Sequence, residues 1–281
     1  MKLIITGSGG CVSLPRPTCQ CRICSEAREK GWPYARCGCS LYIEDRNVLV
    51  DTPEDIAYAL NHLNIKAVDY ILYSHIDPDH TMGMRIIEQL RLDWLAHSQG
   101  WNCDNPILVG TLPRIMEGIE YQGTRYGSAL KYYESMNLAI AKPFRSMDIG
   151  PLHIDLIPVD SSENVTIFVF TEGSSKVIYA PCDVKPFPKS EIFQDADCLI
   201  IGNTIVGNRL KNGFLLEDDN PLRKELFVME EIAGLKEEYN IERVVITHLE
   251  EDWGKSYEDY LELQKQYEGI EFAYDGLRID Y

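Results

Sequence analysis

The chain has 281 residues, of which 45% are apolar, so one large domain or two small ones can form with a sizeable core. Its formal net charge of -17 disfavours nucleic acid as a partner, because a phosphate backbone is bound through clustered Lys and Arg side chains. No apolar run is long enough to span a bilayer, and the apolar start of the chain is too short for a signal-peptide core, so we expect a cytoplasmic protein with no membrane partner.

The first predicted element is a strand over residues 2–6, which is followed by the glycine loop Gly7-Ser8-Gly9-Gly10. One interpretation of this loop is a phosphate cradle. That interpretation is disfavoured because the Gly-x-x-x-x-Gly-Lys pattern is absent and no helix-forming run follows. The alternative is a turn in which the backbone passes close to another segment.

The cysteines provide the next signal. The chain has nine of them, and an odd number without an export signal points to metal binding rather than to disulfides. Cys19, Cys21 and Cys24 have the spacing Cys-x-Cys-x-x-Cys, which lets three thiolates surround one soft cation if a fourth ligand comes from elsewhere. The alternative is three unrelated thiols in a loop. Cys37 and Cys39 precede a predicted strand and either complete this site or pack in the core.

Asp51 lies between a predicted strand over residues 47–50 and a predicted helix start. Thr52 is the expected N-cap and Pro53 occupies the first turn, with acidic residues facing the helix dipole. This arrangement places the Asp51 carboxylate at the end of a strand.

Four potential metal ligands lie within six residues: His75, Asp77, Asp79 and His80. The preceding residues 66–73 are typical of a buried strand, and residues 81–90 have helical periodicity. The ligands are therefore predicted in the turn between strand and helix, which Pro78 stiffens by fixing its own φ. The alternative is a polar loop whose aspartates cap a helix.

Three further potential ligands follow predicted strands in the second half of the chain: Asp160, Asp183 and His248. Together with Asp51 and the turn at His75, they put ligand-type side chains at five strand ends. Ends of neighbouring strands can converge on one edge of a sheet, so this series favours a metal site over an ordinary polar loop.

Residues 91–147 alternate less regularly between strand and helix, although a strand over 105–110 and a helix start over 112–116 are predicted. This segment is rich in aromatic residues: Trp94, Trp101, Tyr121, Tyr126, Tyr132, Tyr133 and Phe144. Beside a metal site, such an insertion is predicted to shape a substrate pocket. The alternative is that the aromatic rings pack onto the core.

The last third of the chain is predicted to contain a long core-facing helix over residues 221–239 and a second helix over 257–267. Residues 270–279 are predicted to form a strand pair around an Asp-Gly turn. No internal repeat or linker-like break is present, so the whole chain, residues 1–281, is predicted to be one domain.

The order of these ligands resembles the metallo-β-lactamase superfamily, and the Cys-x-Cys-x-x-Cys loop is similar to the zinc loop of its PhnP-like phosphodiesterase branch and of the related PqqB branch. The resemblance implies an α/β fold, an αββα sandwich in which two mixed sheets pack face to face with helices outside. It implies that Asp51 supports the metal site through hydrogen bonds. Glu251 stands where the branch has a His as the fourth zinc ligand, and either Glu251, which we favour, or Asp252 could bind through oxygen there. A zinc-binding loop at 19–24 is expected with it.

The resemblance also implies two divalent ions at the active site. Their ligands would be His75, Asp77, Asp160 and Asp183 for the first ion, and Asp79, His80, His248 and the bridging Asp183 for the second. Asp77 and Asp160 replace two family histidines, which moves the preference of the first site from Zn²⁺ toward Mn²⁺, Fe²⁺ or Mg²⁺. The implied cofactors are therefore two ions of Mn, Zn or Fe and one structural Zn.

The activity implied is that of a metal-dependent hydrolase, a phosphodiesterase that cleaves small phosphate esters, cyclic ones included, with a hydroxide that bridges the metals. Its partner would be the small-molecule ester, and a homodimer is left open. Two alternatives come from other classes: a PqqB-like redox or oxygen-using metalloprotein, and a non-catalytic metal-binding scaffold.

Overall fold

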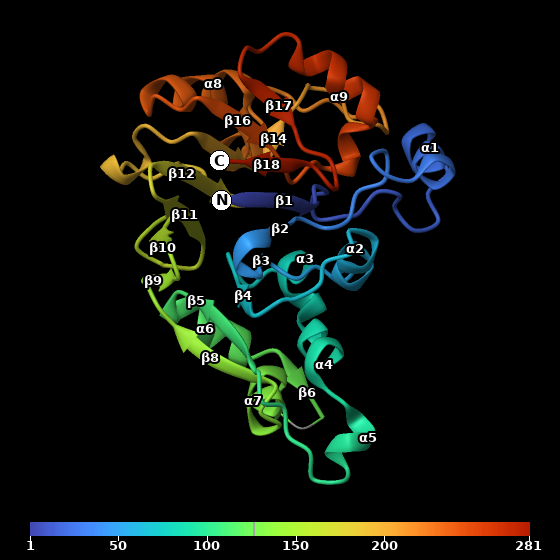
Figure 1. The fold of residues 1–281 in the computed structure, drawn as a ribbon. Coiled ribbons are helices and arrows are strands. Elements are labelled where there is room, and N and C mark those ends of the chain that lie inside the picture. The colour runs from blue at the N-terminus through green and yellow to red at the C-terminus, as the bar shows by residue number, and fades with distance from the viewer. Residues whose placement is uncertain (126) are drawn as a thin grey trace.

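Two seven-stranded sheets lie face to face in the middle of the molecule, with helices on their outer sides (Figure 1). This is seen in a computed structural model that describes residues 1–125 and 127–281, so Tyr126, one of the predicted pocket aromatics, lies outside the described residues. The predicted αββα architecture is confirmed.

The first sheet carries the N-terminal half of the chain and its last strand. In spatial order its strands are β18 (Arg278–Asp280), β1 (Lys2–Gly7), β2 (Ser40–Ile43), β3 (Val48–Val50), β4 (Tyr70–Leu72), β5 (Ile107–Thr111) and β8 (Ala139–Pro143). Strands β3, β4, β5 and β8 are parallel to one another, so their carboxyl ends lie at the same edge.

The second sheet is built from the second half of the chain. Its strands are β17 (Ile270–Phe272), β16 (Arg243–Ile246), β13 (Cys198–Ile201), β12 (Ser175–Ala180), β11 (Thr166–Glu172), β10 (Leu152–Pro158) and β9 (Ser146–Ile149). Strands β12, β13, β16 and β17 are parallel, and Ala180, Ile201 and Ile246 are level with one another in the register.

The α-helices connect and cover these strands. They are α1 (Arg22–Lys30), α2 (Ile56–His62), α3 (Pro78–Thr81), α4 (Ile86–Arg91), α5 (Trp94–His97), α6 (Pro113–Glu120), α7 (Ala129–Ser135), α8 (Met229–Glu238) and α9 (Tyr257–Gln264). Two short sheets pair β6 (Gly123–Thr124) with β7 (Gly127–Ser128), and β14 (Thr204–Ile205) with β15 (Phe227–Val228). Among the helices of the described ranges, none combines the length and apolar character that crossing a membrane requires.

Period-2 alternation divides the apolar strands between two cores. In β11 and β12, Phe168 and Tyr179 belong to a core that draws on both sheets, whereas Ile167 and Ile178 point to the opposite face, where α8 and α9 pack. Such strands are buried on both faces, which explains why their sequences are continuous apolar runs. Each fully buried large side chain contributes about 1.5–3 kcal/mol to the stability of these cores.

The predicted helix over residues 221–239 is half wrong, because only α8, Met229–Glu238, is α-helical. Pro221–Lys224 is a 3₁₀ turn, and Phe227–Val228 forms β15 beside β14. The Glu231 carboxylate accepts a hydrogen bond from the Val228 amide at 2.9 Å, which fixes the start of the helix at Met229.

The predicted strand pair over residues 270–279 is also wrong. β17 joins the second sheet beside β16, whereas β18 joins the first beside β1, so the intervening turn crosses from one sheet to the other. The buried Asp275 carboxylate in this turn accepts hydrogen bonds from the amides of Ser8 and Cys37. These contacts explain the glycine loop, whose Gly7 lies so close to the Gly38 carbonyl that a Cβ would clash with it.

Candidate metal centre

The candidate site lies where parallel strands of both sheets end. In the first sheet, Asp51 follows β3 directly and His75 comes three residues after β4, whose end is level with that of β3. In the second sheet, Cys182, Asn203 and His248 each lie two residues beyond the level ends of β12, β13 and β16. The register therefore brings these side chains to one edge of the sandwich.

The backbone at this edge is strained. Asp51, Asp183, Asn203 and His248 have φ values of 63°, 53°, 55° and 52°, in the left-handed region. This conformation costs roughly 1–2 kcal/mol for a residue with a side chain. Strain of this kind concentrates at functional sites, where the surrounding structure holds it in place.

One group of potential ligands contains His75, Asp77 and Asp183, and one ligand atom of each lies within 4.8 Å of the others. His75 is buried, and its Nε2 lies 3.7 Å from Asp77 Oδ2. Asp77 and Asp183 are exposed, so this group faces solvent. The three residues come from both sheets, as predicted for ligands of one ion.

A second group contains Asp79, His80 and His248, with the same spacing limit of 4.8 Å. Asp79 Oδ2 lies 3.5 Å from His80 Nε2 and 3.4 Å from His248 Nε2. Burial raises the pKa of Asp79, but the two imidazoles lower it more strongly, to about 2. Asp79 and His80 lie in the first turn of α3, because the helix begins at Pro78 and not after the motif as predicted.

Cys182 connects the two groups, and the sequence analysis missed it. Its sulfur forms a third group with His75 and His80, again within 4.8 Å, so it shares one imidazole with each of the other groups. Burial acts against the thiolate, but the surrounding imidazoles lower the pKa of Cys182 well below its usual range. Cys182 therefore lies close to one imidazole of each of the other groups, whereas Asp183, for which the bridging position was predicted, is grouped with His75 and Asp77.

Asp51 orients His80 and the turn at Ser74 through hydrogen bonds. Its carboxylate accepts hydrogen bonds from the Ser74 amide at 2.8 Å and from the Ser74 hydroxyl at 2.7 Å. Its Oδ2 lies 2.8 Å from His80 Nδ1, which leaves His80 Nε2 directed at the site. Burial disfavours the charged imidazole, but the Asp51 carboxylate raises the pKa of His80 well above its usual range. The helix predicted to begin at Thr52 begins at Ile56, because the Thr52 amide donates to the His80 carbonyl.

The donor set fits metal ions. In the part of the chain that the structure describes, His75 Nε2, His80 Nε2 and both ring nitrogens of His248 are buried without a hydrogen-bond partner. A buried polar atom left unpaired costs about 1–3 kcal/mol, so three such imidazoles facing one another need a shared partner. Imidazole, carboxylate and thiolate together suit divalent metal ions such as zinc or iron.

Asp160 lies apart from these groups. It is exposed, and its carboxylate accepts a hydrogen bond from the Ser162 amide at 2.8 Å within the turn between β10 and β11. Of the ligand groups formed by the described residues, none includes Asp160, although it was predicted as a ligand of the first ion. The side chain stabilises its own turn instead, as aspartates at such positions commonly do.

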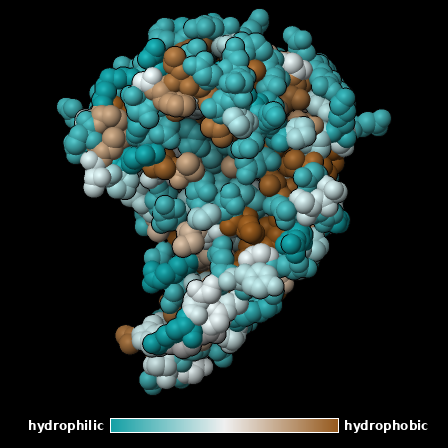
Figure 2. Space-filling view, turned by 180° about the vertical axis from the view of Figure 1, so that it is seen from behind, coloured by the Kyte–Doolittle hydropathy of each residue, from teal (hydrophilic) through white to brown (hydrophobic). Residues whose placement is uncertain are grey.

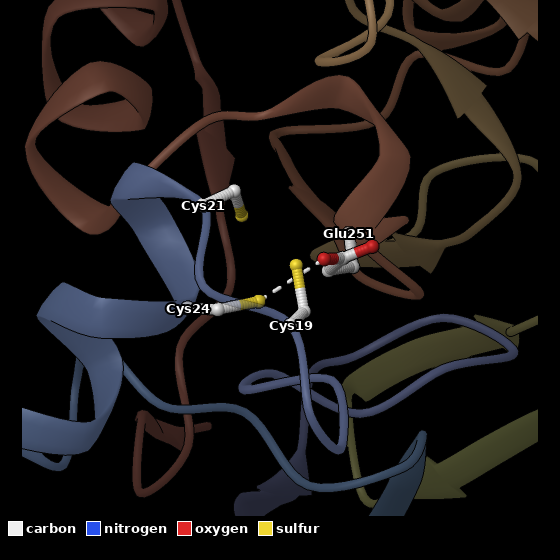
Figure 3. A group of neighbouring side chains, drawn as sticks. All are labelled: Cys19, Cys21, Cys24 and Glu251. Atoms are coloured by element: carbon white, nitrogen blue, oxygen red, sulfur yellow. Dashed lines mark hydrogen bonds between the residues drawn. The ribbon is translucent and has the colours of Figure 1, made fainter.

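The cysteine loop forms a separate site with Glu251, shown in Figure 3. One ligand atom from each of Cys19, Cys21, Cys24 and Glu251 lies within 4.8 Å of the others, and Cys24 Sγ lies 3.1 Å from Glu251 Oε1. Among the described residues, the predicted alternatives Cys37 and Cys39 belong to no such group.

Two cations complete the environment of Glu251. Arg16 Nε lies 3.1 Å from Glu251 Oε2, and the Lys211 ammonium contacts Oε1. Three thiolates and one carboxylate carry four negative charges, so the two side-chain cations leave two to be neutralised by a dication. The charge of the site therefore fits one zinc ion.

The predicted pocket aromatics differ in their positions. Tyr133 and Phe144 are buried in the larger hydrophobic core, whereas Trp94, Trp101 and Tyr121 are exposed. The part of the chain from α4 to β8 forms the lower part of the molecule in Figure 1. Figure 2 shows hydrophobic side chains gathered where this lower part joins the body.

Asn203, which the sequence analysis did not identify, orients the two central ligands. It is 5% exposed, and its Nδ2 donates to Asp183 Oδ1 at 3.0 Å and to Cys182 Sγ at 3.4 Å. We expect Asn203→Gly to weaken metal retention about 10- to 100-fold in competition with a chelator, since a residue that orients ligands has effects of this size. Glycine adopts the positive φ of position 203 readily, so the substitution adds no backbone strain that could itself weaken metal binding.

The matched control is Asn240→Gly. Asn240 also has a positive φ, of 50°, but its amide donates to Asp195, and neither residue belongs to a ligand group of the described chain. The control should retain metal as the wild type does. Equal metal affinity in the two variants would contradict the role of Asn203.

Comparisons with known proteins agree with this fold. The model of the β-lactamase superfamily domain matches residues 46–249. The structure of a diphosphatase from the PhnP family aligns with all of this chain and 96% of its own, at 17% sequence identity and a TM-score of 0.70. Zn²⁺-bound PqqB from Methylobacterium extorquens aligns over the full length of both chains, at 18% sequence identity and a TM-score of 0.72. The short form of human tRNase Z aligns with all of this chain and 99% of its own, at 14% identity and a TM-score of 0.62. No curated protein sequence matches the chain.

Proposed function

The chain belongs to the metallo-β-lactamase superfamily, and from this premise we propose that it is a hydrolase with two divalent ions at the strand ends. More specifically, it acts as a phosphodiesterase on small phosphate esters, cyclic ones included. The observation that carries the proposal is the set of buried, unpartnered imidazole nitrogens of His75, His80 and His248, which face one another at this edge.

The ligands divide into two sets joined by a thiolate. The first ion would be held by His75, Asp77 and Asp183, the second by Asp79, His80 and His248, with Cys182 between them. Three carboxylates and one thiolate carry four negative charges, which matches two dications. The sulfur makes the site softer than one with a bridging carboxylate, so zinc or iron is favoured over magnesium.

The protein side chains define the access to this site. The bound ions would activate a water molecule and polarise the phosphoryl oxygens. His75, His80, His248 and Cys182 are buried and form the floor, whereas Asp77 and Asp183 are exposed. A substrate would therefore approach from the side of Asp77 and Asp183, and Asp51 would keep His80 oriented during turnover.

Two features support a small phosphate ester as substrate. The fold likeness includes a diphosphatase from the PhnP family, and the cysteine loop is similar to the one that characterises that branch. The net charge of -17 disfavours long polyanions, although a tRNase Z shares the fold.

The test is a screen of bis(p-nitrophenyl) phosphate and small cyclic phosphates with Zn²⁺, Mn²⁺, Fe²⁺ and Mg²⁺. We expect metal-dependent release of product, lowered about 100-fold or more by Asp77→Asn, which removes a charged group from the site. Asp160→Asn is the matched control, since Asp160 lies outside the ligand groups among the described residues, and it should leave the rate unchanged. No turnover of any ester, with both ion positions at the strand ends shown to be filled, would reject the phosphodiesterase.

A redox or oxygen-using metalloprotein is the second candidate. The observation that favours it is Cys182, because a thiolate beside carboxylates and imidazoles suits iron. Protein purified without oxygen would then contain redox-active iron and would be coloured.

A further inference from the structure

A cleft of about 170 Å³ opens beside the proposed metal centre. Its lining residues come from three segments: Ile76, Arg114, Ile115, Gly118, Tyr121 and Asn164. Ile76 stands between the proposed ligands His75 and Asp77, and its side chain is 45% exposed. The cleft therefore adjoins the turn that carries His75 and Asp77.

Close contacts hold the three segments together. A Cβ on Gly118 of α6 would lie 2.7 Å from Ile76 Cγ2, so the helix packs directly on the ligand turn. Gln122 Nε2 donates to Thr81 Oγ1 at 2.6 Å, which ties the end of α6 to α3.

The third segment is fixed in the same way. The Thr166 amide, at the start of β11, donates to the Ser74 carbonyl at 2.9 Å, one residue before His75. This bond holds the turn that carries Asn164 against the ligand segment. The walls are therefore set by the same backbone that places the ligands, and the cleft is preformed.

We propose that this cleft binds a single aromatic ring carried by the phosphate ester, a proposal that rests on the proposed function. The volume decides the size of the group, because an apolar cavity of about 150 Å³ holds one benzene molecule. Tyr121 has a ring that is 89% exposed, and Ile76 adds a second apolar surface. The Arg114 guanidinium at the rim can stack on the face of a ring.

The volume of the cleft predicts that it favours a one-ring arm over both a smaller and a larger arm of the ester. An ester with a methyl arm leaves Tyr121 and Ile76 in water and gains nothing from the cleft. A fused two-ring arm exceeds the volume and must leave one ring outside. A one-ring arm should thus be preferred over a methyl arm, with no further gain from a second ring.

The experiment measures binding without turnover. Methylphosphonate, phenylphosphonate and 1-naphthylphosphonate, which cannot be hydrolysed at the P–C bond by this chemistry, are titrated into the metal-loaded protein by calorimetry. We expect phenylphosphonate to bind about 10- to 100-fold more tightly than methylphosphonate, from the burial of one ring, and 1-naphthylphosphonate to bind no more tightly than phenylphosphonate.

Tyr121→Ala should reduce the preference for phenyl over methyl most strongly, and Tyr121→Phe should retain it. The matched control is Phe214→Ala, since Phe214 is 56% exposed on a segment that does not line the cleft. Equal affinity for the three compounds, or a phenyl preference that survives Tyr121→Ala combined with Ile76→Ala, overturns the cleft and leaves the metal centre standing. If none of the three binds to the metal-loaded protein, both proposals are overturned.

Discussion

Replacing Cys182 with alanine is expected to lower turnover sharply and to lower the affinity for both of the proposed metal ions. The sulfur forms a group with His75 and His80, each of which also belongs to one of the other two ligand groups. Loss of a residue that only orients a ligand costs about 10- to 100-fold. Loss of a ligand shared by both ions should cost more, on the order of 10³-fold in kcat/KM, measured with bis(p-nitrophenyl) phosphate and by the metal content of the purified variant.

Two comparison variants make the Cys182 prediction specific. Asp183→Ala removes a ligand of the first group alone, so its effect should be smaller than that of Cys182→Ala. Cys198→Ala is the control, because Cys198 is a fully buried thiol in β13 that belongs to no ligand group of the described chain. If Asp183→Ala proves the more damaging change, Asp183 and not Cys182 is the bridging ligand.

Cys182→Asp probes the nature of the bridge. A carboxylate can span two ions, so this variant should keep part of the activity. Since oxygen is harder than sulfur, its preference should move from zinc toward manganese. Unchanged metal preference would show that the thiolate does not contact the ions.

Cys182 is a candidate ligand that the sequence analysis did not identify, although it named the neighbouring Asp183. The apolar run before Cys182 predicts a strand, and β12 is present, but the pattern does not fix at which residue the strand ends. Neighbouring side chains in extended backbone point to opposite faces, so an error of one residue exchanges a buried group for an exposed one. The signal that could have found Cys182 is its spacing: it lies two residues beyond β12, as His248 does beyond β16.

The other differences between the sequence predictions and the structure arise from tertiary contacts. The motif at His75 was predictable because four potential ligands within six residues are rare in an ordinary loop. Asp160 has the same residue type but serves its own turn, and only the position of the turn shows this. Likewise, β17 and β18 look like a hairpin in sequence, yet each finds its partner in a different sheet.

Replacing Cys24 with serine is expected to remove one zinc ion per chain and to lower the stability of the protein. Cys24 is buried, and its sulfur lies 3.1 Å from Glu251 Oε1. Burial and the Glu251 carboxylate raise the pKa of the Cys24 thiol to about 12, so a cation that binds the thiolate has to displace a proton. Binding by such a closed site contributes directly to folding, and its loss should lower the Tm by well over 5 °C, measured by calorimetry.

The effect should extend to the catalytic centre, because Glu251 lies three residues beyond His248 on the same segment. Between them, Glu250 Oε1 lies 3.3 Å from His248 Nδ1, so the segment carries contacts to both sites. Without the ion, the thiolates and Glu251 repel one another and the position of His248 is less well held. We therefore expect Cys24→Ser also to weaken metal retention at the strand ends.

Lys211→Met and Cys103→Ser separate the causes of this loss. Lys211 contacts Glu251 but is no ligand, so Lys211→Met should weaken zinc binding about 10- to 100-fold while the cysteines remain. Cys103 is a buried thiol outside the described ligand groups, and Cys103→Ser should leave the zinc content unchanged. If Cys24→Ser keeps the zinc content of the wild type, the loop holds no metal. The stability of this region then comes from the ion pairs of Glu251 with Arg16 and Lys211 alone.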